Sequence, residues 1–179
     1  SMMFETSEKN LELIGAYARA VRSPCATSAA SEIYERMPND TDLTVFKRRG
    51  WTGMNFAFIG GLRRYHTPLD DLAHLSPASV QHQGQSALEV VRELADGEVE
   101  PASGADAVYT DVLGLWLVRW PAGWSPALAA GALLGLSFCA RNRVRRGTCA
   151  MREILWGAAG ALALVAASAG VGPALAWVA

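Results

Sequence analysis

Gly53-Met54-Asn55-Phe56-Ala57-Phe58-Ile59-Gly60-Gly61 is the stretch of sequence that decides the fold class. Apolar and aromatic residues dominate the segment 54–59, and glycines bound it on both sides, so the pattern predicts a β-strand there. Because apolar side chains point to both faces, the pattern is typical of an interior strand rather than an edge strand. The segments that flank this strand then decide what covers it.

Helical patterns flank the strand on both sides. Leu11, Ile14, Ala18 and Val21 recur at helical spacing, which predicts a helix over about 7–22. Further helices are expected over about 28–37, 43–49 and 76–96, with Gly50 in the left-handed conformation that often ends a helix. The face of the last helix that carries Val80, Ala87, Leu88, Val91 and Leu94 is expected to be buried. Helices around a buried strand predict an α/β fold.

The charge of the chain is uneven. Residues 1–106 hold 10 Lys+Arg and 15 Asp+Glu, whereas residues 107–179 hold 6 and 2 and are far more apolar. A polar stretch rich in Gly, Glu and Pro covers 97–104 and reads as a boundary. We therefore expect an α/β domain over 1–96, a linker over 97–106 and a membrane region over 107–179. The overall net charge of −1 gives no support to nucleic-acid binding.

Two uncharged apolar runs follow the linker, at about 120–140 and 154–179. The first would rise about 31 Å as a helix, which matches the hydrocarbon core of a bilayer. Arg141, Arg143, Arg145 and Arg146 lie between the two runs, and the positive-inside rule places the loop 141–153 in the cytoplasm. Residues 1–106 would then be extracytoplasmic. The alternative is a pair of buried core helices in a soluble domain.

His66 is the candidate site residue that the pattern itself singles out. It follows the predicted strand and precedes a predicted helix start, with Thr67 as N-cap and Pro68 at the first helical position. Ligands of open α/β sheets bind at the carboxyl ends of strands. A lone histidine supplies one ligand, however, and a catalytic zinc needs about three from the protein. His74 and His82 share no helical face in this interpretation and are not expected to be ligands.

A resemblance to a known family extends this interpretation. Residues 4–95 resemble the last third of the di-zinc aminopeptidase family that includes glutamate carboxypeptidase and the endoplasmic reticulum metallopeptidases. The order of domain, linker and spans is similar to that of its membrane-anchored subgroup. The segments that carry the likeness are Phe4-Glu5-Thr6, Pro38-Asn39-Asp40-Thr41-Asp42, Val45-Phe46, Gly53–Ile59, Tyr65-His66-Thr67 with Asp70, and Gln81-His82-Gln83-Gly84.

The resemblance implies a fold and a role for several residues. The fold would be an incomplete three-layer α/β domain of the zinc-exopeptidase kind, followed by transmembrane α-helices. His66 matches the family's last zinc ligand, and Tyr65 matches a tyrosine whose hydroxyl stabilises the oxyanion of the tetrahedral intermediate. The alternative for Tyr65 is a packed aromatic at the end of a strand. Asp70 is expected to be structural, capping a helix and ordering the loop of His66.

The departure from the family limits what this chain can do. The family uses two zinc ions, five metal ligands and a general-base glutamate, and the other ligands precede the segment that matches Phe4. Residues 1–65 contain no histidine, and Glu5 lies after the expected position of an acidic ligand, so it is not assigned. We expect at most one partial zinc site here and no peptide hydrolysis by this chain alone.

Three functions remain open from the sequence. The first is part of a membrane-anchored zinc-dependent exopeptidase, an aminopeptidase that cleaves peptide bonds with metal-bound hydroxide. The second is a non-catalytic, peptidase-like membrane scaffold or binding protein, and the third is a membrane protein of unrelated function. Expected partners are a peptide substrate in the complete protein, membrane lipid, and further copies of the chain that cover exposed strand edges.

Overall fold

The chain forms two compact units, Ser1–Ser125 and Pro126–Ala179. The structure is a computed structural model that describes residues 1–60, 62–97, 104–148, 150, 152–154, 156–161 and 163. The division between the units comes later than the polar stretch predicts, because the segment that follows this stretch packs into the first unit. The expected boundary at 97–106 therefore falls inside the first unit.

The predicted strand forms, but not where the sequence pattern places it in a sheet. β2 (Met54–Ala57) pairs antiparallel with β1 (Met2–Thr6), from Met2 opposite Ala57 to Thr6 opposite Met54. The other edge of β1 is occupied, since the backbone N–H of Met3 donates to the carbonyl of Cys25 at 2.9 Å. Within the described residues β1 is the only strand that pairs with β2, so the prediction of an interior strand is wrong for this part of the chain. Apolar residues on both faces indicate that both faces of the strand are covered. They do not indicate how many strands lie beside it.

The second sheet is a hairpin that the sequence analysis missed. β3 (Ala107–Val112) pairs antiparallel with β4 (Trp116–Pro121). The turn between them places Leu113 and Gly114 at φ 55° and 68°, and Asp111 accepts a hydrogen bond from the Gly114 N–H at 3.1 Å. Alternate β3 residues, Ala107 and Tyr109, are buried in the core of the first unit. Residues 107–121 therefore belong to the first unit, and the prediction that the membrane region begins at 107 is wrong.

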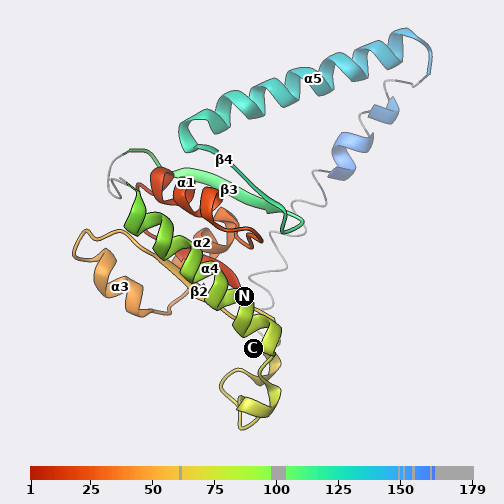
Figure 1. Cartoon of the computed structure of the whole chain (residues 1–179). Helices are drawn as coiled ribbons and strands as arrows, with labels where there is room; N and C mark the ends of the chain where they lie inside the picture. Colours follow the sequence, from red (N-terminus) through yellow and green to blue (C-terminus); the bar gives the residue numbers. More distant parts are fainter. Residues whose placement is uncertain are drawn as a thin grey trace. The chain divides into compact units, whose positions relative to one another are not determined.

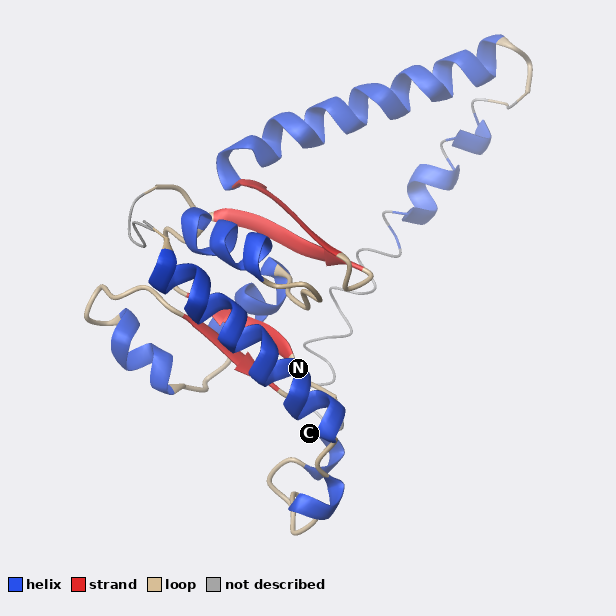
Figure 2. Cartoon of the chain, in the orientation of Figure 1, coloured by secondary structure: helices blue, strands red, loops and turns tan. Residues whose placement is uncertain are grey.

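The predicted helices of the first unit are confirmed, with shorter bounds. They are α1 (Leu11–Ala20), α2 (Ser28–Glu35), α3 (Asp42–Lys47) and α4 (Pro77–Asp96). The hydroxyl of Ser76 caps α4 by accepting from the Ser79 N–H, and Gly50 has the predicted left-handed φ, 75°. Figures 1 and 2 show α1 and α4 side by side, both packed over the sheets.

The face of α4 that packs against the unit is only in part the predicted one, since Leu94 packs against the core as expected. Val80, Leu88 and Val91 are exposed, whereas Ser86 and Val90 are buried. Ion pairs fix this orientation: Arg19 of α1 reaches Glu93 at 2.7 Å, and Arg22 reaches Glu89 at 3.4 Å. A small polar residue fits the close approach of the two helices, so packing overrides the apolar stripe that the sequence suggests.

Two tyrosines anchor the core of the first unit. Its buried apolar members are Met3, Ile14, Tyr17, Val21, Ala26, Val90, Ala107 and Tyr109. The hydroxyl of Tyr17 accepts a hydrogen bond from the Cys25 N–H at 3.1 Å, and burial raises the pKa of Tyr17 to about 12. The hydroxyls of Tyr109 and Ser31 lie 3.0 Å apart. Each buried phenol thus has the polar partner that burial demands.

The second unit contains a long apolar helix. α5 (Ser125–Arg145) begins later than the predicted span of about 120–140 and continues through arginines that were expected in a loop. No residue of α5 is buried, and the stretch Ala122–Arg145 is long and apolar enough to cross a membrane. Of the second predicted span, 154–179, only residues 154, 156–161 and 163 are described, so most of that prediction lies outside the described residues.

Candidate functional site

A cavity of about 510 Å³ opens beyond the end of β2, in the region where the sequence places the site. Short 3₁₀ turns, Leu62–Arg64 and Leu72–His74, and the start of α4 shape it. Its lining residues are Ala57, Phe58, Gly60, Arg64, Tyr65, Leu69, Asp70, Asp71, His74, Leu75, Ser76 and Ser79. Tyr65 thus lines the cavity, whereas its neighbour His66 does not.

The segment after His66 is a pair of turns, and the predicted helix start at Thr67 is wrong. The backbone N–H and the hydroxyl of Thr67 both donate to the carbonyl of Arg64, at 3.1 and 2.7 Å. The N–H of Asp70 donates to the carbonyl of Thr67 at 3.0 Å, which closes a four-residue turn with Pro68 in its second position. Proline favours that position of a turn as strongly as the first position of a helix, so the same residues satisfy both patterns.

His66 lies at the surface in an uncommon backbone conformation. Its φ is 58°, in the left-handed region that few residues other than glycine adopt. Its imidazole stacks on the ring of Tyr65, with centroids 4.0 Å apart and planes 20° from parallel. Residues in such strained conformations cluster at functional sites, so the backbone of His66 agrees with a functional role for the Tyr65–His66 pair.

The side chain of Tyr65 is 62% exposed at the wall of the cavity, where its ring stacks on His66. The two roles expected for it, oxyanion stabiliser or packed aromatic at the end of a strand, both stay predictions. A phenol at a cavity wall is placed to donate a hydrogen bond to a molecule bound there.

The sequence analysis missed the histidine that does line the cavity, His74. Asp71 Oδ1 accepts from the His74 N–H at 3.1 Å and lies 2.7 Å from His74 Nδ1, and this hydrogen bond lowers the pKa of the Asp71 carboxyl. The structure thereby brings Tyr65, Asp70, Asp71 and His74 to one cavity. The Asp-x-x-His spacing was the available signal, since an aspartate that caps a 3₁₀ turn meets the side chain three residues later.

These residues do not fit a complete catalytic zinc centre. Among the residues that the structure describes, no three His, Cys, Asp or Glu side chains converge well enough to hold a metal ion. A catalytic zinc takes three protein ligands and an open position. His66 fits the part of a single ligand, so no reaction step through a metal follows from this part of the chain.

Glu5 is buried for a structural reason. Its Oε2 accepts from Thr41 Oγ1 at 2.7 Å and from Asn55 Nδ2 at 3.2 Å, and Lys47 Nζ lies 3.5 Å from Oε1. These contacts tie β1 to both ends of α3 and to β2. A buried carboxylate is tolerated where partners satisfy it, and that role agrees with leaving Glu5 out of the metal ligands.

Comparisons with known proteins agree with the family that the sequence resembles. Residues 1–91 match Peptidase family M28. The chain is 31% identical to endoplasmic reticulum metallopeptidase 1 of Homo sapiens over 127 residues, which is 67% of this chain and 14% of that protein. It is 28% identical to the vacuolar membrane protease of Eremothecium gossypii over 125 residues, 68% of this chain and 12% of that protein. The chain thus spans a small part of these relatives, and no solved structure matches it.

Proposed function

The chain belongs to Peptidase family M28, and from this premise we propose that it is part of a membrane-anchored zinc-dependent exopeptidase. The complete protein would be an aminopeptidase that releases N-terminal residues or dipeptides. The observation that carries the proposal is the stacked Tyr65–His66 pair beside the 510 Å³ cavity, within the range that matches the family.

The proposed roles follow from where the two side chains lie. The exposed imidazole of His66 would supply one ligand to a metal whose other ligands come from elsewhere in the longer protein. The phenol of Tyr65 would donate a hydrogen bond to the oxygen that gains charge when the substrate carbonyl is attacked. The cavity wall, with Asp70, Asp71 and His74, would hold the peptide beside them.

The experiment has two arms, one on this chain and one on the full-length protein. For the purified chain in detergent we expect zinc affinity no better than micromolar and no turnover of aminoacyl-anilides, because one ligand does not make a catalytic site. In the full-length protein, His66→Ala should abolish activity with loss of bound zinc. Tyr65→Phe should lower kcat by about 10²–10³ with zinc retained.

Matched substitutions control for damage to the fold. His82→Gln, on α4 and away from the cavity, should leave both the zinc content and the turnover of the full-length protein unchanged. Nanomolar zinc binding with turnover by this chain alone would contradict the partial site. Full activity of the His66→Ala protein would remove His66 from the metal site.

A membrane anchor is the second part of the proposal. α5 is supported as a span by its length, its apolar composition and the absence of buried residues along it. By the positive-inside rule, the loop 141–153 would be cytoplasmic and the first unit extracytoplasmic. In a chain whose Cys25, Cys139 and Cys149 are replaced by serine, a membrane-impermeant maleimide should label a cysteine introduced at Thr148 only after the membrane is permeabilised. Labelling in intact cells would reverse the topology.

The non-catalytic scaffold stays as the alternative, and the metal-site geometry is the observation that favours it. The described residues offer one matched ligand, as a degenerate peptidase domain would. The coding sequence upstream of Met2 separates the two functions. A His-x-Asp motif followed by a Glu-Glu pair in frame supports the enzyme, and a chain that lacks both supports the scaffold.

A further inference from the structure

Four arginines lie at the end of α5, and we propose that they form a binding site for the phosphate groups of anionic membrane lipids. We call Arg141, Arg143, Arg145 and Arg146 the arginine collar. The inference rests on the proposed membrane anchor and names the class of lipid that this anchor prefers. The positive-inside rule concerns the side of the membrane on which these residues lie; the present inference concerns what they bind.

The collar follows directly on an apolar stretch of membrane length. No charged residue occurs from Ala122 to Ala140, a stretch that rises about 28 Å as a helix against a hydrocarbon core of about 30 Å. Trp124 is 64% exposed at the other end, where an interfacial aromatic is expected. A helix that fills the hydrocarbon with this stretch places its first collar arginine at the level of the headgroups.

The arginines spread over more than half of the circumference of the helix. Successive residues of an α-helix are about 100° apart, so the four collar positions lie at about 0°, 200°, 40° and 140° around the axis. Arg146 continues the last turn, since its N–H donates to the carbonyl of Asn142 at 3.0 Å. A protein groove or a nucleic-acid backbone would be met by a one-sided stripe. Lipid headgroups reach a helix from every side, so guanidinium groups spread over an arc of about 200° can each contact a headgroup.

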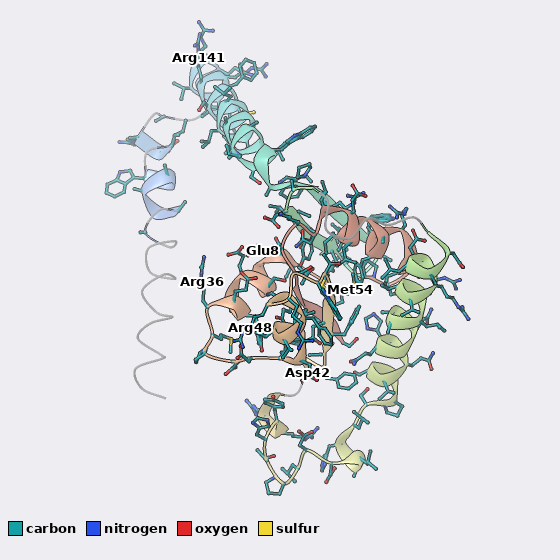
Figure 3. All side chains as sticks on the ribbon, turned by 90° about the vertical axis from the view of Figure 1, so that its left-hand side faces the viewer. Glu8, Arg36, Asp42, Arg48, Met54 and Arg141 are labelled. Carbon is teal, nitrogen blue, oxygen red and sulfur yellow. The ribbon has the colours of Figure 1, made fainter. Side chains whose placement is uncertain are left out.

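Backbone N–H groups of the residues that follow the helix pair with its last carbonyl groups. The guanidinium groups are therefore not needed to satisfy these carbonyls. The N–H of Thr148 donates to the carbonyl of Arg143, and the N–H of Gly147 donates to that of Val144, at 3.1 and 3.0 Å. Gly147 has φ 68°, as this type of helix end requires. Figure 3 shows Arg141 projecting from this end of α5.

The positive charges of the arginine collar are best balanced by anions that do not belong to the described part of the chain. Arg141 and Arg145 are four residues apart, a spacing at which like charges destabilise a helix. All four side chains are exposed, and in the described part of the chain no ion pair joins any of them to a carboxylate. Guanidinium groups bind phosphate oxygens in a two-pronged manner, and the cytoplasmic leaflet supplies phosphate on anionic lipids.

The test measures which lipids lie next to the helix. The full chain is reconstituted in phosphatidylcholine nanodiscs that contain trace spin-labelled lipid, with either a phosphatidylserine or a phosphatidylcholine headgroup. We expect the motionally restricted fraction to favour phosphatidylserine by about fivefold or more, since each arginine near an anionic surface contributes about fivefold. Replacing the collar by four glutamines should reduce the preference to about one, and 1 M NaCl should weaken it in the unchanged chain.

A control variant removes the same charge elsewhere. Arg36, Arg48, Arg49 and Arg63 are exposed in the first unit, two of them labelled in Figure 3, and their replacement by glutamine should leave the lipid preference unchanged. An equal preference in the collar variant overturns the proposal while the membrane anchor stands. Failure of the chain to enter nanodiscs overturns the anchor and the collar together. Loss of the preference in 10 mM inorganic phosphate would show a site for free phosphate and overturn the assignment to lipid.

Discussion

Leucine side chains are buried in a helix of the first unit and exposed in the helix of the second unit. Leu13 of α1 is 3% exposed, whereas Leu134 of α5 is 71% exposed. The first unit closes an apolar core with residues of its own, whereas no residue of α5 is buried. A closed apolar core is stable in water, whereas a long apolar helix without buried residues exposes a large apolar surface. This difference is the observation that supports the proposed membrane anchor.

The first prediction makes the same truncation in both units and has the largest expected effect. Leu13→Ala should lower the free energy of unfolding of the first unit by about 2–5 kcal/mol, because it removes buried methyl groups and leaves a cavity. Leu134→Ala should leave that free energy within about 0.5 kcal/mol, as exposed substitutions do. Chemical denaturation of the full chain in mild detergent, followed by tryptophan fluorescence, measures both.

Two outcomes would break this comparison. Equal loss in both variants would mean that α5 contributes to the fold of the first unit. Equal tolerance would mean that the core around α1 is not closed in solution. Val91→Ala on α4, where the side chain is 60% exposed, supplies a control within the first unit itself and should behave like Leu134→Ala.

The second prediction uses the interior of the first unit and concerns alkaline pH. Burial raises the pKa of Tyr17 from an ordinary 10.0 to about 12. The unfolded chain therefore releases this proton first, so stability is retained below pH 10 and lost as the pH rises towards 12. A shift of this size corresponds to about 2–3 kcal/mol.

One variant tests whether Tyr17 causes this loss of stability at alkaline pH. Tyr17→Phe should remove most of the fall in stability between pH 10 and 12, at the expense of about 1 kcal/mol for the hydrogen bond from Cys25. Burial also raises the pKa of Tyr109, so a smaller fall should remain. An unchanged alkaline transition in the Tyr17→Phe protein would show that the phenol titrates in contact with water.

Local chemistry explains which parts of the fold could be predicted from the sequence. Ser76-Pro77 begins α4 where the sequence places it, because a capping hydroxyl and a proline both act within one turn. The β3–β4 hairpin was missed because the apolar composition of 107–179 was interpreted as a membrane region. Its turn and the burial of Tyr109 depend on contacts with distant segments, and periodicity does not report them.

The candidate site was also predicted only in part, because some of its features depend on contacts that sequence periodicity does not report. The segment after β2 does carry Tyr65 to a cavity, as expected at the carboxyl end of a strand. His66 is not among the lining residues, and its left-handed backbone and the turns that follow it were not predicted. His74 was set aside on sequence spacing, yet Asp71 brings it to the cavity through a short 3₁₀ turn.

The third prediction, with the smallest expected effect, concerns charge in the two units. The first unit buries the carboxylate of Glu5 to 2% exposure beside Thr41, Asn55 and Lys47, whereas α5 excludes charge until its last turns. Glu5→Gln keeps the shape and loses the charge, and should lower the free energy of unfolding by about 1–2 kcal/mol. Glu32→Gln, at a pair 64% and 80% exposed, should lower it by less than about 0.5 kcal/mol. A larger loss in the second variant would show that the buried carboxylate is not held by its partners. A charged side chain would then be as unfavourable in the interior of the first unit as in the uncharged stretch of α5.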